Sequence, residues 1–530
     1  MPVAARKTED VVRGLSDPAA YDPRPASVRV RRTHGSFVFL TGQWAFKMKR
    51  PVKYPFFDFS TLEKRREALA RELRLNRRLA PDVYLDVLPV LAEGGRLRVG
   101  RAGEEAGAAE FLLRMAELPP DGFLPARLER GEPGEPLLER AAEAVADFHL
   151  RAERGGEIAR HGAPEAVKNL LLGNLGECAS LPPAQRSWGR VTADCRASLE
   201  RLLGELDEVL GRRAGEGFVR DVHGDLRMEH VVFAGEKVVV FDCLDFRDDF
   251  RCMDVIHEAA TLVMELCLAG RRAEARAFLR AYLDRTGDDA GLPLLPLYFL
   301  HRALVRGKVE GLLAASEDAP PAERERAGER SRALFRLAGE AAARERRPRL
   351  VLVGGLMASG KSALARGLAR ASGMAAHHSD PVRKELAGLA PTAPAREAWG
   401  RGLYAEGMSG RVYAELLARA RRDLEGGRGA VVDASFSRQS GRAAFARLAE
   451  EAGARLRWIA CECPLEERRG RLARREARGG SASDGRIEIM AAQEAAFEPW
   501  EPSEEGRLEV DTSGPPEASL RAALRALYFP

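Results

Sequence analysis

One short run of residues constrains the fold of this 530-residue chain more than any other part of it. The run is GLMASGKS, residues 355–362, which follows the apolar stretch 350–353 and precedes a helical pattern. Glycines there let backbone N–H groups converge on a phosphate, and the N-terminus of the following helix adds partial positive charge. A plain glycine-rich turn is the alternative. The pattern predicts a strand, a nucleotide-binding loop and a helix, with phosphate bound by Gly355, Ser359, Gly360, Lys361 and Ser362.

Helical patterns and short apolar runs alternate after this loop, with apolar runs at 430–433 and 456–462. This alternation predicts a parallel α/β sheet. Asp433 ends the first run, and its carboxylate and the Ser362 hydroxyl are the kind of oxygen ligand that Mg²⁺ prefers. Ala434 follows Asp433 in place of the glutamate with which a motor-type ATPase activates water, so transfer of phosphate to a bound acceptor is favoured over hydrolysis.

Another acid lies between the loop and Asp433, in the segment HSDPVRK at 378–384. At the end of the second strand, Asp380 would point into an acceptor pocket and accept the proton of an acceptor hydroxyl as a catalytic base. Arg383 follows one helical turn later and can bind an anionic acceptor. A simple helix cap is the alternative role for Asp380.

Five arginines crowd a predicted helix at 468–475, and the loose segment GGSASDG follows at 479–485. Arg471 and Arg475 are four residues apart and therefore lie on one helix face. Arginines on a mobile lid neutralise charge on the transferring phosphoryl group as water is expelled, which makes both residues catalytic candidates alongside Lys361. A solvated basic helix is the alternative.

Together these motifs resemble the P-loop small-molecule and zeta-toxin-like kinases, a group that includes gluconate-kinase-like enzymes and often carries the label AAA-type ATPase. The resemblance covers about 348–515. It implies a P-loop NTPase fold, ATP and Mg²⁺ as cofactors, and the hydroxyl group of a small molecule as acceptor. It also implies an acceptor-binding role for Arg442, which follows the matching segment VVDASF at 431–436.

A second constellation lies in the first half of the chain. The segment HGDLRMEH at 223–230 precedes the apolar stretch 238–241, which ends at Asp242. The spacing suits a phosphotransferase in which Asp225 orients the acceptor hydroxyl and Asp242 holds Mg²⁺ on ATP. A pair of acids in turns is the alternative.

This half resembles the aminoglycoside phosphotransferase-like family, and in particular its members fused ahead of a P-loop domain, over about 28–310. The resemblance implies a bilobal protein-kinase-like fold. On that basis Lys47 binds the α- and β-phosphates, with Lys49 on the same strand face as the alternative, and Glu72 on the next helix pairs with the lysine. Alternating residues near 28–50 predict the antiparallel strands that such a lobe contains.

One residue departs from that family's pattern. His230 stands five residues after Asp225, where the family has an asparagine as a Mg²⁺ ligand. Mg²⁺ prefers oxygen, whereas an imidazole nitrogen suits softer metals. The first half is therefore either a second catalytic site or a pseudokinase that binds ATP or another ligand. An ATP-driven switch for a protein partner is a third hypothesis.

We expect four segments: an N-terminal extension at 1–27, the phosphotransferase-like domain at 28–315, a solvated helical linker at 316–347 and the P-loop domain at 348–530. The net charge of +5 is small for this length, so the overall charge does not indicate nucleic-acid binding. No apolar run reaches the length of a membrane helix, and the N-terminus lacks a signal-peptide pattern. We therefore expect a cytoplasmic protein with a small-molecule partner, and the sequence leaves its oligomeric state open.

Overall fold

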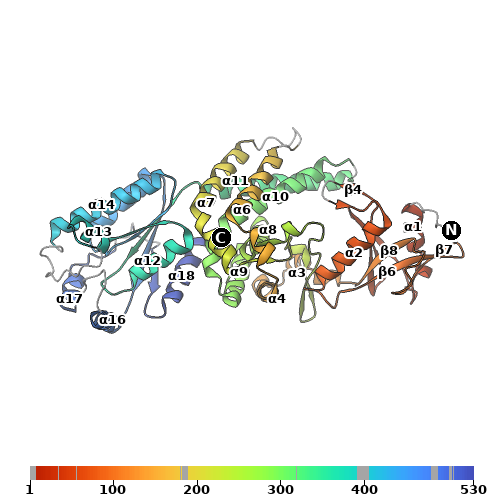
Figure 1. The fold of residues 1–530 in the computed structure, drawn as a ribbon, viewed down its shortest axis with the longest axis horizontal. Helices are drawn as coiled ribbons and strands as arrows, with labels where there is room; N and C mark the ends of the chain where they lie inside the picture. The colour runs from red at the N-terminus through yellow and green to blue at the C-terminus, as the bar shows by residue number, and fades with distance from the viewer. Residues whose placement is uncertain are drawn as a thin grey trace. The chain divides into compact units, whose positions relative to one another are not determined.

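The computed structural model describes residues 8–33, 35–54, 57–179, 181, 189–317, 319–390, 405–478, 487–500, 504 and 507–530. The chain forms two compact units, and Figure 1 labels many of their helices and some of their strands. The first unit consists of Met1–Gly162 and Ala214–Gly287, and the second of Ala163–Arg213 and Asp288–Pro530. Within the described residues, no helix combines the length and the apolar character needed to cross a membrane.

A six-stranded antiparallel sheet forms one lobe of the first unit (Figure 1). Its strands in spatial order are β1 (Arg29–Arg32), β2 (Ser36–Leu40), β3 (Trp44–Lys49), β8 (Glu110–Ala116), β6 (Tyr84–Glu93) and β7 (Arg96–Val99), and β4 (Lys53–Tyr54) and β5 (Phe57–Asp58) form a separate ribbon. The strands expected near 28–50 are thus confirmed. Phe39, Phe46 and Met48 are buried with Leu15 of helix α1 (Thr8–Leu15), so the N-terminal extension packs on this sheet.

Helix α2 (Leu62–Asn76) packs against this sheet and carries Glu72. The Thr61 hydroxyl accepts a hydrogen bond from the backbone N–H of Lys64, which fixes the start of the helix. Leu69 is fully enclosed on the inner side of the helix, while most charged residues lie on the outer side. The helix ends at Asn76, before Pro81.

Helices and two short ribbons form the other lobe of the first unit. The helices are α3 (Leu124–Glu129), α4 (Gly134–Arg151), α5 (Gly156–Arg160), α8 (Val255–Leu268) and α9 (Arg272–Thr286). The ribbons pair β9 (Val219–Asp221) with β12 (Cys252–Asp254) and β10 (Val231–Ala234) with β11 (Lys237–Val240). Asp225 lies between β9 and β10, and Asp242 follows β11 closely. The bilobal protein-kinase-like fold expected for this half is confirmed.

A five-stranded parallel sheet forms the centre of the second unit. Its order is β14 (Ala375–His378), β15 (Ala430–Asp433), β13 (Arg349–Gly354), β16 (Arg455–Glu462) and β17 (Leu508–Asp511), and all neighbours are parallel. The glycine-rich loop joins β13 to α12 (Lys361–Ser372). The expected parallel α/β fold with a P-loop is therefore confirmed.

Helices cover both faces of this sheet. Leu350 and Leu352 of β13 are buried beneath α14 (Glu406–Glu425) and α15 (Gln439–Glu451). Because side chains alternate along a strand, Val351 and Val353 point to the opposite face, where α12 and α18 (Pro516–Tyr528) pack. The other helices of this part are α13 (Ser379–Leu386), α16 (Leu465–Arg478) and α17 (Ile487–Ala495).

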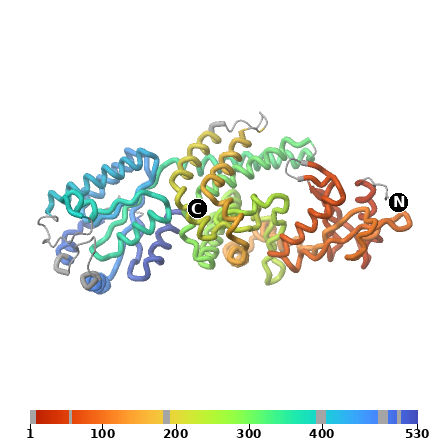
Figure 2. Tube along the Cα trace, viewed as in Figure 1, coloured from red at the N-terminus to blue at the C-terminus, as the bar shows by residue number. Residues whose placement is uncertain are grey.

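Four further helices complete the second unit. They are α6 (Pro164–Ala179), α7 (Gly189–Glu216, in this unit up to Arg213), α10 (Leu295–Ala315) and α11 (Pro321–Glu345). Helices α10 and α11 lie side by side (Figures 1 and 2), and Leu334, Phe335 and Ala338 of α11 are buried. The expected linker is thus helical, but one side of it is packed. Helices α6, α7 and α10 fall inside the expected first domain, whose boundaries stay a prediction.

Helix α7 contacts both α11 and the loops next to the parallel sheet. The Ser198 hydroxyl donates to the carbonyl of Ala342 (2.8 Å), and the Arg201 guanidinium donates to the carbonyl of Glu345 (2.8 Å). Glu205 of α7 accepts from the N–H of Gly429 (3.1 Å), just before β15. A Cβ built on Gly373, directly after α12, would lie 1.9 Å from the Glu205 carbonyl oxygen. The end of the P-loop helix therefore lies directly against α7.

We predict that Gly373→Ala destabilises the second unit more than Gly388→Ala. Both glycines have a φ of 71°, but an added Cβ at Gly388 would meet nothing within 4 Å. The left-handed conformation costs about 1–2 kcal/mol in either variant, whereas overpacking, typically about 1–3 kcal/mol, is added only at Gly373. Calorimetry of the full-length variants should show the lower transition temperature for Gly373→Ala, and equal temperatures would contradict the close contact with α7.

Candidate functional site

The loop between β13 and α12 has the geometry of a phosphate cradle. Gly355 has a φ of 147°, and a Cβ there would lie 2.6 Å from Ser359 Oγ, so glycine is required. The Thr512 hydroxyl, which follows β17, donates to the Ser359 carbonyl. Ser359 Oγ is buried and has no hydrogen-bond partner among the described residues. Lys361, half-buried, begins the helix at the end of this loop.

Asp433 lies beside this loop, because β15 pairs with β13 in a register that sets Val353 opposite Asp433. His378 Nδ1 donates to Asp433 Oδ2 (2.9 Å), and Oδ1 has no partner among the described residues. Burial would raise the pKa of Asp433, but the hydrogen bond from His378, the charge of Lys361 and the nearby Ser362 hydroxyl outweigh it and lower the pKa. A buried, ionised carboxylate thus keeps one oxygen for another partner.

Asp380 lies at the same edge of the sheet as Asp433. Strand β14 ends at His378, which the parallel register sets opposite Asp433, and α13 begins with the next residue. Asp380 is half-buried in the first turn of α13, whose N-cap residue is His378, so the capping role considered for Asp380 does not apply. Arg383 lies one turn further on and donates to Ser409 Oγ of α14 (3.4 Å).

Arg471 of α16 contacts the phosphate loop. Its guanidinium donates to the carbonyls of Ala358 (3.4 Å), Thr512 (2.5 Å) and Ser513 (3.3 Å). Arg471 therefore lies next to the site, where its catalytic role remains a prediction. The side chain of Arg475 and the expected lid at 479–485 lie outside the described residues.

Arg442 lies in a buried position, which favours a structural role over the expected role in acceptor binding. Its side chain is fully buried, forms an ion pair with Glu504 (2.6 Å) and lies 4.7 Å from the centre of the Trp500 ring. It also donates to the carbonyls of Phe436 (3.0 Å), Glu498 (3.2 Å) and Pro499 (2.7 Å). These contacts use the guanidinium within the chain, so it is not presented to a ligand.

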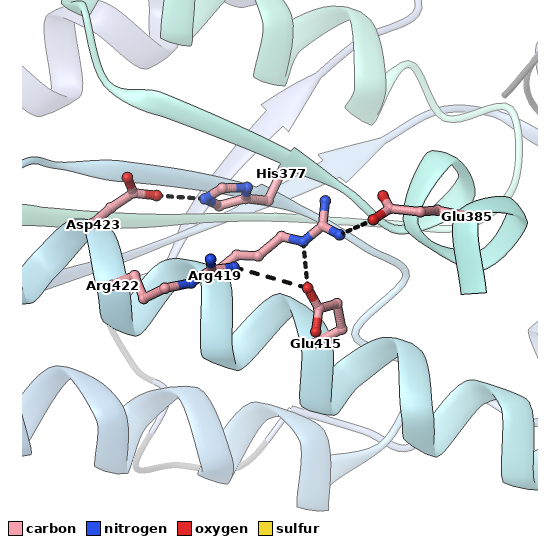
Figure 3. A pocket seen from close by; sticks show the side chains of 6 residues that line it. All are labelled: His377, Glu385, Glu415, Arg419, Arg422 and Asp423. Carbon is pink, nitrogen blue, oxygen red and sulfur yellow. Dashed lines mark hydrogen bonds and ion pairs between the residues drawn. The ribbon is translucent and has the colours of Figure 1, made fainter.

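A polar pocket of about 550 Å³ lies where β14, α13 and α14 meet (Figure 3). His377 Nε2 donates to Asp423 (2.6 Å), and Arg419 pairs with both Glu385 (2.8 Å) and Glu415 (2.7 Å). Side chains alternate along a strand, so His377 points away from the side on which His378 meets Asp433. The carboxylates of this pocket are paired with its two arginines and with His377, and we assign the pocket no ligand.

In the first unit, one buried carboxylate holds two lysines of β3. Lys47 Nζ lies 2.7 Å from Glu72 Oε1 and 3.1 Å from Asp242 Oδ1. Lys49 Nζ lies 2.7 Å from Glu72 Oε2 and 2.8 Å from Asp245 Oδ2. Burial would lower the pKa of Lys47, but Asp242 and Glu72 raise it well above the usual value. Of the two lysines, only Lys47 reaches the proposed metal ligand Asp242, which favours it for nucleotide binding.

Asp242 occupies a strained turn that its neighbours stabilise. Its φ is 63°, a left-handed value that is rare outside glycine. The Tyr84 hydroxyl accepts from the N–H of Asp242 (3.1 Å), and the Asn76 side chain accepts from the N–H of Cys243 (2.8 Å). Burial would raise the pKa of Asp242, but Lys47 and His230 outweigh it and lower the pKa. The carboxylate is 46% exposed, so a ligand can reach it.

Glu258 of α8 anchors the loop that contains Asp225 through hydrogen bonds. Glu258 accepts hydrogen bonds from the backbone N–H groups of His223 (3.0 Å) and Gly224 (2.5 Å) and from His149 Nε2 (2.7 Å). Burial would raise the pKa of Glu258, but these partners lower it. The half-buried Asp225 is thereby presented at the end of a rigid loop.

Arg227 belongs to this site although the sequence interpretation did not single it out. It forms an ion pair with Glu265 (3.2 Å) and another with Glu229. Burial would lower the pKa of Arg227, but the charges of Glu265, Asp225 and Glu229 raise it. Its position two residues after Asp225 is the sequence feature that indicates a role in this site. A fixed cation beside Asp225 suits a site that handles phosphate.

Both sites can contribute ligands to a nucleotide-bound metal. Among the described residues, no three His, Cys, Asp or Glu side chains form a metal-binding group by themselves. Mg²⁺ bound to nucleotide needs fewer protein ligands, since phosphates and water supply the others. Ser362 with Asp433 fits this requirement, because Asp433 Oδ1 lacks a partner within the described residues. Asp242 with His230 forms the corresponding pair in the first unit.

The two units together define the fold class of this protein: the chain joins a bilobal protein-kinase-like fold to a parallel α/β fold with a phosphate-binding loop. The family described as AAA domain matches residues 350–500. The chain belongs to the same family as the uncharacterized protein Rv2004c of Mycobacterium tuberculosis, to which it is 32% identical over 500 residues, or 94% of each chain.

Two solved structures show more distant similarity. A choline/ethanolamine kinase family protein from Mesorhizobium loti is 16% identical with a TM-score of 0.36, covering 63% of this chain and 98% of that one. A sugar kinase from Janibacter is 20% identical with a TM-score of 0.27, covering 34% of this chain and 95% of that one.

We predict that Lys361→Ala strongly lowers nucleotide turnover by the second unit and leaves the fold intact. Lys361 is a half-buried loop residue outside the apolar core, and loss of one such electrostatic contact lowers turnover by about 10²–10³-fold. ATP consumption should be measured in full-length protein carrying Asp225→Asn, so that the first unit does not contribute. Arg366→Ala, an exposed substitution on the same helix, is the matched control, and retained turnover in Lys361→Ala would refute the assignment.

We also predict that Arg442→Met lowers the stability of the fold, whether or not it also lowers acceptor affinity. Breaking a buried ion pair costs about 3–5 kcal/mol because the remaining partner stays buried. Arg438→Met is the matched control, since Arg438 is 62% exposed and its pair with Glu406 contributes about 1 kcal/mol or less. Thermal unfolding of the two variants tests this. An Arg442→Met protein with unchanged stability but weakened acceptor binding would restore the binding role.

Proposed function

We propose that the second unit is an ATP-dependent kinase that phosphorylates a hydroxyl group of a small molecule. The observation that carries this proposal is the convergence of three elements at the carboxyl edge of the parallel sheet. There β13 leads into the phosphate loop, β15 ends at Asp433, and β14 leads into the helix with Asp380. Ligands of open α/β sheets bind at this edge. A second carboxylate after Asp433, which water activation would require, is lacking in the sequence.

The residues of this edge have complementary roles in the proposed reaction. Lys361 and the N-terminus of α12 stabilise the negative phosphates. Ser362 and Asp433 would hold Mg²⁺, which neutralises phosphate charge when bound. The oxygen of the acceptor hydroxyl bonds to the γ-phosphorus, and Asp380 takes the proton of that hydroxyl. At the same time the bond between the γ-phosphorus and the departing ADP oxygen breaks. Arg383, one turn along α13, attracts an anionic group of the acceptor.

For the first unit we propose a second phosphotransfer site that also uses ATP. Lys47, oriented by Glu72, contacts the nucleotide phosphates, and Asp242 contributes to metal binding. Asp225 accepts the proton of a second acceptor hydroxyl. The support for this proposal is the network in which Lys47 joins Glu72 to Asp242, because that network connects the sheet lobe to the loop after β11.

A regulatory first unit is the second candidate, and His230 is the observation that favours it. An imidazole in place of an oxygen ligand weakens use of Mg²⁺, so the first unit would bind ATP or another ligand and control the second. An ATP-driven switch for a protein partner is less favoured, because Ala434 follows Asp433.

A metabolite screen with γ-labelled ATP distinguishes these proposals. Four full-length proteins would be compared: wild type, Lys361→Ala, Asp225→Asn and the double variant. Products lost in Lys361→Ala belong to the second unit, and products lost in Asp225→Asn belong to the first. Unchanged products in Asp225→Asn would support the regulatory role, and products formed by the double variant would overturn both assignments.

We predict that Asp380→Asn lowers phosphoryl transfer by the second unit by about 10²–10⁴-fold, the usual contribution of a general base. The amide keeps the shape of the carboxylate but cannot accept the proton. ATP affinity, measured in parallel by calorimetry, should stay within about twofold if Asp380 acts only on the acceptor. An equal loss of ATP affinity would show that Asp380 supports the nucleotide site.

A further inference from the structure

The imidazole of His230 is oriented by a hydrogen bond on one of its two nitrogens. Nδ1 lies 2.8 Å from the backbone carbonyl oxygen of Asp225. A carbonyl oxygen only accepts hydrogen bonds, so Nδ1 carries the hydrogen. In the neutral ring, Nε2 then presents its lone pair on the opposite side. A backbone carbonyl bonded to one ring nitrogen is the usual arrangement behind a metal-binding histidine.

The second nitrogen faces the carboxylate expected to bind metal. His230 Nε2 lies 3.8 Å from Asp242 Oδ2, while the other oxygen of Asp242 lies 3.1 Å from Lys47. Two ligands that each lie about 2.1 Å from one metal ion can be at most about 4.2 Å apart. The distance between Nε2 and Oδ2 is therefore short enough for both atoms to bind a single ion between them.

The ring is also fixed by its surroundings. His230 is only 7% exposed, and its ring centre lies 5.7 Å from that of His223 and 5.8 Å from that of Phe241. Glu229 Oε1 also lies 3.8 Å from Nε2, but this carboxylate forms an ion pair with Arg227. A ring packed in this way has little freedom to turn Nε2 away from Asp242, which lowers the entropic cost of binding a ligand.

We propose that His230 Nε2 is a metal ligand and that the first unit binds its nucleotide with Mn²⁺ or another nitrogen-accepting divalent metal in preference to Mg²⁺. This inference rests on the proposed nucleotide site of the first unit. Imidazole nitrogen binds first-row transition metals well, whereas Mg²⁺ demands oxygen. With a nitrogen ligand, AMP-PNP should bind about tenfold or more tightly with Mn²⁺ than with Mg²⁺, and His230→Asn should bring the two affinities close together.

The test uses electron spin echo envelope modulation on full-length protein with Mn²⁺ and AMP-PNP. Lys361→Ala is present throughout, to weaken nucleotide binding by the second unit. A directly bound imidazole gives ¹⁴N modulation, which ¹⁵N-histidine labelling replaces with a ¹⁵N pattern without any substitution at position 230. His230→Asn should abolish the modulation, whereas His378→Asn, which removes the histidine next to Asp433, should leave it. Calorimetry with Mg²⁺ and AMP-PNP checks that His230→Asn still binds nucleotide and is folded.

The outcomes separate this inference from the function on which it rests. Histidine ¹⁴N modulation that is lost in His230→Asn supports the inference. Mn²⁺ and AMP-PNP that bind without ¹⁴N modulation, or with modulation unaffected by His230→Asn, would overturn the ligand role and leave the nucleotide site standing. Binding of AMP-PNP that is equally tight in the presence of EDTA would overturn the metal role of this site. A first unit that binds no AMP-PNP with either metal would overturn the nucleotide site and this inference together.

Discussion

A charge that is removed from water needs a partner inside the protein, and both candidate sites are organised by this constraint. In the first unit the buried Glu72 holds Lys47 and Lys49, and in the second His378 holds Asp433. Such pairing compensates a desolvation cost of several kcal/mol per ion. The charged groups that nucleotide chemistry requires are therefore already oriented by contacts within the chain, and a nucleotide has only to exchange some of these contacts for its own.

Residues whose role follows from local backbone chemistry could be predicted from the sequence. A glycine-rich turn between a buried strand and a helix is encoded within a few consecutive residues, so Gly355 and Lys361 were placed correctly in a loop of the expected shape. Roles that depend on distant segments could not be predicted. Arg442 and Arg383 look alike in sequence, and the sequence does not show that carbonyl groups more than 50 residues along the chain bond to Arg442. Glu258, which supports the loop of Asp225, is bonded to His149, 109 residues away.

The orientation of His230 illustrates the same limit on a smaller scale. The sequence shows that an imidazole replaces the expected oxygen ligand, which raises the question of metal use. Whether its lone pair faces the carboxylate depends on the fold, because the Asp225 carbonyl selects which nitrogen carries the hydrogen. The linker is a similar case, since the sequence predicts a solvated helix at 316–347 but does not show that α10 packs on one side of it.

The packing of α7 has a consequence for how this protein is made. Ser198 and Arg201 bond to backbone groups 144 residues later in the chain, and Glu205 bonds to a backbone group 224 residues later. During synthesis on the ribosome, α7 therefore emerges well before its partners in α11 and before β15. The apolar side of α7 stays exposed until those segments have been synthesised. Pairings this distant in sequence form slowly and leave aggregation-prone surface uncovered in the meantime. The second unit can therefore complete its packing only after α11 and β15 have been synthesised.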